Sequence, residues 1–530
     1  MDKILTAKID GREMDNDQII DAILESRGID NLADFLHPKE SDLIPFEEMI
    51  GIEEAAQIIN NTVDNNGRFL VFFDVDADGI CGGAIVTRYL EKMEANVDIH
   101  IGKGKAHGLQ SLPLDKVKGI DTLIIIDSIN DDARLYEAIL DLGVTILVLD
   151  HHIIPQSLIN ANLDITLVSC MNDYPNTALS GSAVAWKTMA YIDYLNLTDY
   201  ADDLIDLAAT GLVGDMMDLS VPENRYICYE GFNNLQNPAL KKIIGSYAFN
   251  SEGVSFSISP LVNACMRTEN NNIAMQMFLS DDDKEITELI QAAKEAKELQ
   301  KDIAEALITE LILQGEEQED KKCKVFFIPP EFHNLSGLLG NQLLSIFSCP
   351  LLVVHQKDGM VTGSMRAVGV TDFAAMINET GLAEAKGHEL ASGFECDEVV
   401  FDQFLIAIEE ELRDVEFVTY AEADIELKPT QINEALVKSL ASINRISGSG
   451  FKPVKVLVRT DNYEVSTFTS QKHLKIIDES GLLIVKWNTD AWRTMDNNGT
   501  IVAVGTVASP YYGRTRYLQL TIDDYTKQND

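Results

Sequence analysis

The chain has 530 residues, which is too long for one hydrophobic core and predicts three or four domains. Its 46% hydrophobic and 24% charged residues are typical of a soluble globular protein, and no apolar stretch reaches the ~18 residues of a membrane span. The formal net charge of −43 argues against a nucleic-acid partner for most of the chain. Residues 421–530 are the exception, because their 13 Lys and Arg balance their 13 Asp and Glu.

The cysteines and the N-terminal sequence indicate the compartment. Seven cysteines are dispersed along the chain without a CxxC pair, which disfavours zinc knuckles and disulfide frameworks. The opening sequence, MDKILTAKIDGREMDNDQ, lacks the apolar core of a secretory signal. We therefore expect a cytoplasmic, monomeric protein with no membrane association.

The first half of the chain predicts a helical lead-in followed by a parallel sheet. Residues 1–66 contain amphipathic runs such as QIIDAILESRGI and IEEAAQIINNTVDNN, which favour helices. Residues 67–275 alternate continuous apolar runs, such as RFLVFFDVD, DTLIIID and TILVLD, with helical stretches, as in a parallel sheet covered on both faces. Because the sites of such sheets lie at the carboxyl ends of strands, Asp74, Asp127 and Asp150 are expected to converge.

The second half predicts three further parts. Residues 276–322 form a connecting helix that runs into an acidic linker, GEEQEDKKC. Residues 323–418 form a smaller α/β domain with strands in KVFFIP, PLLVVHQ and MVTGSMRAV. Residues 419–530 contain alternating strands in VKVLVRT, LLIVKWN, TIVAVGTV and YLQLTID, which favour a small β-barrel.

The stretch VFFDVDADGICGG carries three alternating aspartates, and alternation in an extended chain places their side chains on one side. Carboxylates in such close proximity repel one another, and a bound Mg²⁺ or Mn²⁺ ion removes this repulsion. Two such ions can also activate a water molecule and clamp a phosphate. Each aspartate taken alone is equally well explained as a turn residue or a helix cap. The candidate metal ligands are Asp74, Asp76, Asp78, Asp127, His151 and Asp215.

Two further residues follow the strand that ends in VLDHHI. Asp150 is expected to orient a neighbouring histidine, and His152 is expected to face the substrate phosphate. A structural histidine is the alternative explanation for each imidazole taken alone.

Four motifs occur in order along the chain: DVDADG, an aspartate after a second strand, DHH, and GD after a helix. In this order they resemble the DHH phosphoesterases, and most closely the RecJ-like single-strand DNA exonuclease group. SRGIDNLADFLHP, TALSGSAVAWKTM and PENR resemble further RecJ segments, while GSMRAV and KGHELASGF resemble the signatures of the DHHA1 domain. The resemblance implies an α/β fold in which a parallel-sheet DHH domain is joined by a long helix to a smaller DHHA1 domain, followed by an OB-like barrel.

The resemblance also implies a ligand set. It makes the six candidate residues above the holders of two divalent ions, Mn²⁺ or Mg²⁺. Arg366, Gly387 and His388 match the DHHA1 positions that hold the phosphate or terminal nucleotide of the substrate. Asn263 and Arg267 match a polar loop that faces the cleft.

Two segments offer positive charge to a phosphodiester chain. The Gly-rich IGKGKAHGLQ is either an exposed turn or a contact to the strand, and YYGRTRYLQL combines aromatics that stack on bases with arginines that contact phosphates. Alternating tyrosines are also ordinary sheet residues. The candidate strand-binding residues are Lys103, Lys105, His107, Tyr511, Arg514 and Arg516.

The sequence therefore predicts a metal-dependent exonuclease on single-stranded DNA, with 5′→3′ polarity, release of mononucleotides and a role in DNA repair and recombination implied by the resemblance. One alternative is a DHH phosphodiesterase of short oligonucleotides or cyclic dinucleotides. Another is a catalytically lapsed scaffold or inhibitor that binds a protein partner through its acidic surface. A single-strand-binding protein or another basic protein is the expected protein partner.

Overall fold

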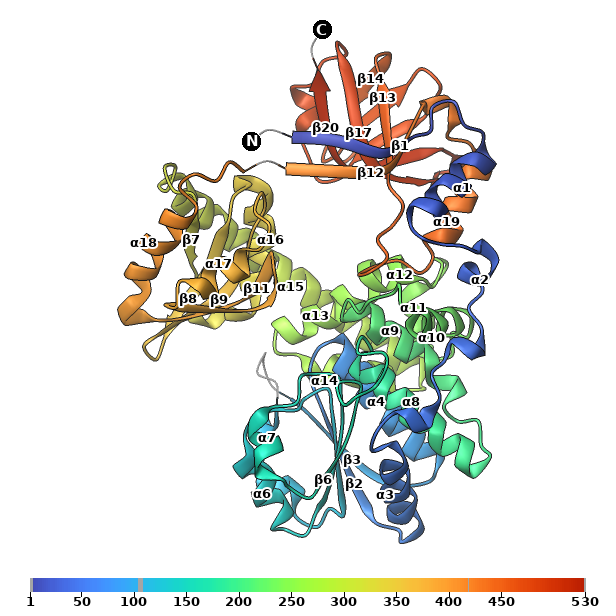
Figure 1. The fold of residues 1–530 in the computed structure, drawn as a ribbon, viewed down its shortest axis with the longest axis vertical. Coiled ribbons are helices and arrows are strands. Elements are labelled where there is room, and N and C mark those ends of the chain that lie inside the picture. The colour runs from blue at the N-terminus through green and yellow to red at the C-terminus, as the bar shows by residue number, and fades with distance from the viewer. Residues whose placement is uncertain (1–2, 103–107, 418, 529–530) are drawn as a thin grey trace. The chain divides into compact units, whose positions relative to one another are not determined.

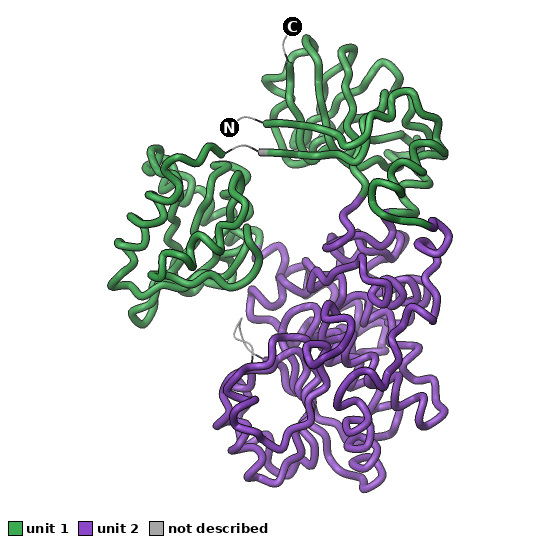
Figure 2. The backbone as a smooth tube through the Cα atoms, viewed as in Figure 1, with its two compact units in different colours: residues 1–30, 301–443, 454–530 green, residues 31–300, 444–453 purple. Residues whose placement is uncertain are grey.

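The computed structural model describes residues 3–102, 108–417 and 419–528. The chain divides into two compact units (Figure 2). Unit 1 is built from residues 1–30, 301–443 and 454–530, and unit 2 from residues 31–300 and 444–453. Each unit is therefore assembled from segments that are distant in the sequence.

Unit 2 contains a parallel sheet of five strands in the order β3-β2-β4-β5-β6. Its strands match the predicted apolar runs and are β2 (Arg68–Phe73), β3 (Asn96–Ile101), β4 (Thr122–Ile126), β5 (Thr145–Asp150) and β6 (Ile165–Ser169). The chain turns outward from β2 to β3 and then returns to the other side of β2 as β4. This reversal creates a switch point between the carboxyl ends of β2 and β4, where ligands bind in open α/β sheets.

Helices cover both faces of this sheet (Figure 1). On one face Phe69, Val71 and Phe73 pack with α3 (Ile52–Asp64), α4 (Ala77–Lys92) and α8 (Gly181–Asn196). On the other face Leu70 and Phe72 pack with α5 (Leu114–Val117), α6 (Ala133–Leu140) and α7 (Gln156–Ala161). Because successive residues of β2 point into opposite cores, the strand needs a continuous apolar sequence. The predicted α/β class is confirmed.

A helical region completes unit 2, and a buried arginine anchors the returning segment 444–453 to it. The main helices are α9 (Ile205–Gly214), α10 (Pro222–Asn233), α11 (Pro238–Ile244), α13 (Ser259–Arg267) and α14 (Asn271–Leu279). The guanidinium of Arg225 lies 3.7 Å from the ring centroid of Phe35 and 5.3 Å from that of Phe451. It donates hydrogen bonds to the carbonyls of Leu219 and Ile446, which satisfy a charge that burial would otherwise make costly.

Unit 1 contains a second, smaller α/β sheet in the order β10-β11-β9-β8-β7. Its strands are β7 (Lys324–Phe327), β8 (Leu351–Lys357), β9 (Met360–Arg366), β10 (Ala383–His388) and β11 (Ala391–Asp397). Only β7 and β8 are parallel. The helices beside this sheet are the end of α15 (Asp283–Glu316), α16 (Ser336–Phe347), α17 (Phe373–Glu379) and α18 (Phe401–Glu411).

The third sheet confirms the β-rich C-terminal region and holds a strand from the other end of the chain. Its eight strands run β1-β12-β13-β17-β20-β16-β15-β14. Besides β1 they are β12 (Thr419–Leu427), β13 (Val456–Thr460), β14 (Tyr463–Ser466), β15 (Leu474–Asp478), β16 (Leu483–Lys486), β17 (Thr500–Ala508) and β20 (Gln519–Gln528). Closure of these strands into an OB-like barrel stays a prediction.

The N-terminal segment differs from the helical lead-in expected for residues 1–66. Residues Lys3–Asp10 form β1, which pairs in parallel with β12, while α1 (Asn16–Ser26) and α2 (Leu32–Leu36) follow it. Within KILTAKID, residues 5–10 alternate apolar and polar, which is a strand pattern, but the partner strand lies more than 400 residues away in the sequence. Arg27 reinforces the docking through a pair of hydrogen bonds to the carboxylate of Asp424, with distances of 2.7 and 2.8 Å.

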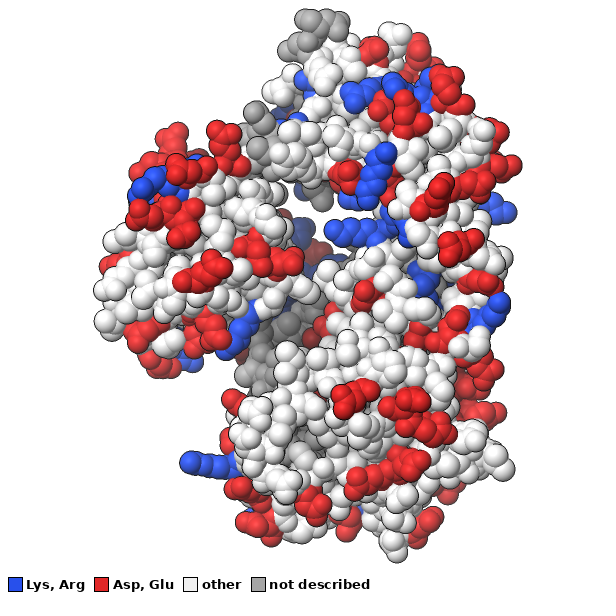
Figure 3. All heavy atoms as spheres, in the orientation of Figure 1, with Lys and Arg blue, Asp and Glu red and all other residues white. Residues whose placement is uncertain are grey.

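Acidic side chains are spread over the face shown in Figure 3, as expected for a net charge of −43. None of the described helices combines the length and apolar character that a membrane crossing requires.

Candidate metal centre

Aspartates gather at the switch point of the parallel sheet in unit 2. Asp74 follows β2, Asp127 follows β4, and Asp150 ends β5. Since β2, β4 and β5 are adjacent and parallel, their carboxyl ends meet at one edge. The convergence predicted from the sequence is present in the fold.

The DVDADG stretch is not extended throughout, which corrects the expectation that alternation alone aligns its aspartates. Helix α4 begins at Ala77, and Asp76 is its N-cap, with a carboxylate oxygen that accepts from the backbone N–H groups of Asp78 and Gly79 at 3.0 Å each. A Cβ at Gly79 would lie 2.7 Å from the carbonyl oxygen of Asp74, so the tight turn requires glycine. The glycine lets the helix start immediately beside the strand end.

Asp78 points toward the N-terminus of α8. Its carboxylate accepts from the N–H of Gly181 at 2.6 Å, the N–H of Ser182 at 3.1 Å and the hydroxyl of Ser182 at 2.5 Å. One of its oxygens also lies 4.0 Å from His151 Nε2. A Cβ at Gly211 would come within 2.3 Å of the Asp78 carboxylate, so α9 also approaches closely here. Asp78 therefore holds the N-terminus of α8 beside the site, and its carboxylate remains close to His151.

Asp127 carries the signs of a functional position. Its φ of 53° lies in the left-handed region, an uncommon conformation for a residue other than glycine. The side chain is buried, and its Oδ1 has no hydrogen-bond partner among the described residues. Burial and the neighbouring carboxylates, led by Asp78 and Asp76, hold the pKa of Asp127 well above its usual range. A cation at this point would oppose that shift, because it stabilises the ionised carboxylate.

The histidines lie against these carboxylates. His151 Nε2 is 3.2 Å from Asp127 Oδ1 and 3.4 Å from Asp215 Oδ2, and Asp215 is the C-cap of α9. His152 Nδ1 lies 2.8 Å from Asp150 Oδ1 and 3.4 Å from Asp127 Oδ1. Burial alone would raise the pKa of Asp150, but hydrogen bonds from His152 outweigh it and hold that pKa below its usual range.

Three overlapping groups of side chains could each hold a metal ion. Within each group one ligand atom per residue lies within 4.8 Å of the others. The groups are Asp74–Asp76–Asp127, Asp127–His151–His152 and Asp78–His151–Asp215. Carboxylate oxygens with imidazole nitrogens suit Mg²⁺ and Mn²⁺, so the donor set fits divalent cations.

The predicted substrate-binding residues of unit 2 are only partly described. Lys103, Lys105 and His107 lie outside the described residues. Asn263 and Arg267 are one turn apart on α13, so they share a face, and Arg267 donates to the side chain of Gln300 at 3.4 Å.

In unit 1, two of the predicted nucleotide-binding residues lie in register on neighbouring strands. Arg366 on β9 and His388 on β10 both pair with Ala391 of β11, so their side chains lie on one face of the sheet. Arg366 Nε donates to Asn341 Oδ1 at 2.7 Å, which fixes the guanidinium, and burial lowers the pKa of Arg366. Gly387 has a φ of 137°, which other residues rarely adopt.

The tail residues form a short hairpin, in which Tyr511 of β18 (Tyr511–Tyr512) pairs with Arg516 of β19 (Thr515–Arg516). The Arg516 guanidinium lies 6.0 Å from the ring centroid of Tyr511. Arg514 occupies the turn between the two strands.

Beside this hairpin lies an aromatic cluster that the sequence analysis missed. The rings of Phe468 and Trp487 stack with centroids 5.5 Å apart, and Tyr512 lies 5.4 Å from Phe468. His473 packs edge-on against Trp487 at 4.8 Å. Half-exposed aromatics of this kind can stack on bases. Because these side chains come from separate strands and loops, no local sequence pattern groups them.

The sequence and the fold of this chain resemble those of known proteins. Residues 68–212 match the model of the DHH family, N-terminal domain. The chain is 28% identical over 455 residues to YorK of Bacillus subtilis (strain 168), which is named as an SPbeta prophage-derived single-strand DNA-specific exonuclease. That match covers 76% of this chain and 78% of YorK.

Residues 68–212 therefore form a DHH-family domain, and the chain resembles RecJ over most of its length. It is 25% identical over 470 residues to the single-stranded-DNA-specific exonuclease RecJ of B. subtilis, covering 84% of this chain and 58% of that RecJ. Its fold matches RecJ of Thermus thermophilus, solved in complex with Mn²⁺, with a TM-score of 0.78 and 20% identity over 99% of this chain and 80% of that one. The predicted resemblance to the DHH family and its RecJ-like group is confirmed.

Proposed function

We propose that this RecJ-like chain is a metal-dependent exonuclease that hydrolyses terminal phosphodiester bonds of single-stranded DNA. We further propose 5′→3′ polarity, release of mononucleotides and a role in DNA repair or recombination. The observation that carries the proposal is the convergence of carboxylates and imidazoles at the switch point of the parallel sheet. The names of the relatives, single-strand DNA-specific exonucleases, support the substrate.

The residues that would hold two divalent ions, Mn²⁺ or Mg²⁺, come from five elements or their ends. They are Asp74, Asp76, Asp127, His151 and Asp215, with Asp78 as a sixth candidate that also fixes α8. When bound, such ions make water a stronger nucleophile at neutral pH and neutralise charge on the phosphate. RecJ of T. thermophilus has been solved with Mn²⁺ and with Mg²⁺, which is consistent with this ligand set.

Asp150 and His152 are assigned roles beside the metal ions, and His152 also belongs to one of the three groups that could hold an ion. Asp150 accepts from the backbone N–H of Ile129 and from both the backbone and the ring of His152, so its carboxylate is rigidly held. A carboxylate beside the ring nitrogen orients the imidazole. We assign His152 to the substrate phosphate, where its ring would contact a phosphate oxygen.

Strand binding is assigned to unit 1 and to the polar face of α13. Arg366 and His388 lie on one sheet face and would hold a phosphate or a terminal nucleotide. The aromatic cluster of Phe468, Trp487 and Tyr512 would stack bases, while Arg514 and Arg516 contact the backbone.

The test is degradation of 5′-labelled single-stranded DNA with Mn²⁺ by the full chain and by Asp76→Asn. Asparagine retains the N-cap acceptor of α4 but removes the charge, so the fold is kept while metal binding is weakened. We expect Asp76→Asn to lose at least a hundredfold in rate. The matched control is Asp15→Asn, at the N-cap of α1, which should retain full activity.

Three substrates separate the proposal from its alternatives. We expect a long single strand to be degraded faster than a duplex or a dinucleotide. To test polarity, the single strand carries a phosphorothioate block at one end. We expect a block at the 5′ end to stop the reaction and a block at the 3′ end to leave it unaffected. Faster cleavage of the dinucleotide would favour a phosphodiesterase of short oligonucleotides. If the unaltered chain leaves every substrate intact, the enzymatic assignment is wrong.

A further inference from the structure

Strand β7 forms one end of the mixed sheet in unit 1. Among the described strands it pairs only with β8, in parallel, so one side of its backbone has no neighbouring strand in the part of the chain that the structure describes. The backbone N–H groups of Lys324 and Ile328 donate toward the β8 side. Since backbone groups alternate along a strand, those of Cys323, Val325 and Phe327 face the open side. An open edge of this kind is a template for another strand.

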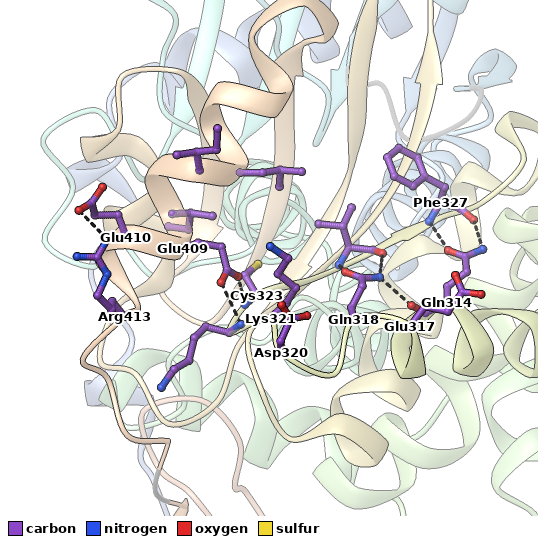
Figure 4. Close-up of a pocket in the computed structure, with 15 residues that line it drawn as sticks. Gln314, Glu317, Gln318, Asp320, Lys321, Cys323, Phe327, Glu409, Glu410 and Arg413 are labelled. Carbon is purple, nitrogen blue, oxygen red and sulfur yellow. Dashed lines mark hydrogen bonds and ion pairs between the residues drawn. The ribbon is translucent and has the colours of Figure 1, made fainter.

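Two glutamines occupy that open edge in place of a strand: Gln314 near the end of α15 and Gln318 in the turn that follows this helix. The Gln318 amide accepts from the Val325 N–H at 2.8 Å and donates to the Val325 carbonyl at 2.7 Å. One turn earlier, the Gln314 amide accepts from the Phe327 N–H at 3.0 Å and donates to the Phe327 carbonyl at 3.3 Å (Figure 4). Each amide thus presents the donor and the acceptor that a residue of a paired strand would present.

A third side chain continues the same pattern toward the start of β7. The Glu409 carboxylate of α18 accepts from the N–H of Cys323 at 2.8 Å and from that of Lys322 at 3.3 Å. Polar groups of long side chains, not a strand, therefore satisfy the open edge. Such contacts can be exchanged for a strand without leaving buried backbone groups unsatisfied.

A groove of about 1040 Å³ runs between the end of α15, β7 and α18 (Figure 4). Its apolar lining comes from Val325, Phe327, Leu405, Ile406 and Ile408. Ile406 is 70% exposed and Phe327 is 41% exposed, so apolar surface lies open to solvent beside the capped edge. A strand laid along β7 would cover it, with alternate side chains directed into the groove.

The chain around the groove is strongly acidic. Residues 316–322 and 409–416 together contain nine Asp and Glu but three Lys and Arg. Of these cations, Arg413 pairs with Glu410 at 2.9 Å and the Lys322 ammonium donates to the Val415 carbonyl. The charge of the rim therefore favours a positively charged occupant.

We propose that this groove binds an extended, basic segment of a partner protein, which adds to the sheet as a strand beside β7. The incoming backbone would replace the amides of Gln314 and Gln318. Its apolar side chains would pack on Phe327 and Ile406, and its Lys or Arg side chains would lie against the acidic rim. In such strand addition, main-chain hydrogen bonds supply affinity and alternate side chains supply specificity. The proposal does not depend on the exonuclease assignment.

The test uses the full chain and a fluorescein-labelled nine-residue peptide of alternating lysine and valine, followed by fluorescence anisotropy. Two matched peptides separate strand pairing from charge attraction. One carries N-methyl groups on alternate residues, so it keeps the charge but loses the edge hydrogen bonds, and the other has glutamate in place of lysine. We expect both to bind at least tenfold more weakly. Absence of binding by the unmodified peptide, or equal binding of the N-methylated one, overturns the proposal.

Variants of the chain locate the binding at this edge. Gln314→Ala combined with Gln318→Ala removes the competing amides, so we expect the lysine–valine peptide to bind several-fold more tightly. Ile406→Ser removes apolar surface from the groove and should weaken binding several-fold. Val399→Ser is the control, because Val399 is 85% exposed but does not line the groove. Unchanged affinity in the glutamine double variant, or equal effects of the two serine variants, contradicts a site at β7.

Discussion

The substitution Asp127→Asn tests whether the buried acidic cluster is built for cations. Asparagine is nearly isosteric with aspartate and tolerates the left-handed backbone conformation at this position, where φ is 53°. The substitution removes the carboxyl group of Asp127 from the acidic cluster that also contains Asp74, Asp76 and Asp78. The variant should therefore stabilise the chain without metal and lose the stabilisation that metal provides.

The structure sets the size of both effects. Ligand atoms of Asp74, Asp76 and Asp127 lie within 4.8 Å of one another. Two unit charges at that distance repel by about 3 kcal/mol at an effective dielectric constant of about 20. Protonation relieves part of this repulsion, so we expect a gain of about 1–3 kcal/mol in the variant without metal. At a metal concentration of about 100 Kd, the unaltered chain should gain about 2.7 kcal/mol, which the variant largely lacks.

The assay is thermal unfolding at pH 7 in EDTA and in Mn²⁺, followed by circular dichroism. A change of 1 kcal/mol shifts the Tm of a unit of this size by about 2–4 °C. We expect Asp127→Asn to melt above the unaltered chain in EDTA and below it in Mn²⁺, whereas Asp15→Asn should respond to Mn²⁺ as the unaltered chain does. If Mn²⁺ does not raise the Tm of the unaltered chain, or if the variant is less stable in EDTA, the reasoning is refuted.

Three further predictions concern stability and strand binding. Lys187→Met should cost about 3–5 kcal/mol in urea unfolding, because it leaves buried Glu223 without its ion-pair partner at 2.8 Å; a loss below 1 kcal/mol would contradict this. Trp487→Ala should weaken binding of single-stranded DNA, measured by anisotropy, by about 1–3 kcal/mol, and an unchanged Kd would exclude the aromatic cluster from the interface. Burial raises the pKa of Asp206 to about 6, so the folded chain holds that proton more tightly than the unfolded chain and the free energy of unfolding should fall as pH rises from about 5 to about 7. Asp206→Asn should flatten that part of the pH profile, and an identical profile would argue against the shift.

Local patterns were sufficient for the parallel sheet of unit 2 and for the region of the candidate metal centre. The continuous apolar runs at β2, β4 and β5 indicate strands of a parallel sheet, because strands buried on both faces need continuous apolar sequence. The aspartates at their ends then had to lie at one edge of the sheet. The aromatic cluster around Phe468 and Trp487 could not be found in this way, since its members come from separate strands and loops.

The sequence by itself determined the α/β class, the RecJ-like motifs and the residue types at the metal centre, because strand periodicity and strand-end chemistry are local. Only the tertiary structure decided that Asp76 caps α4, that Asp78 bonds to the start of α8, and that Lys3–Asp10 adds to the C-terminal sheet. It also decided that Gln314 and Gln318 cap the edge of β7. Each of these depends on where a backbone N–H or a strand edge lies in space, and residues far apart in the sequence supply its partner.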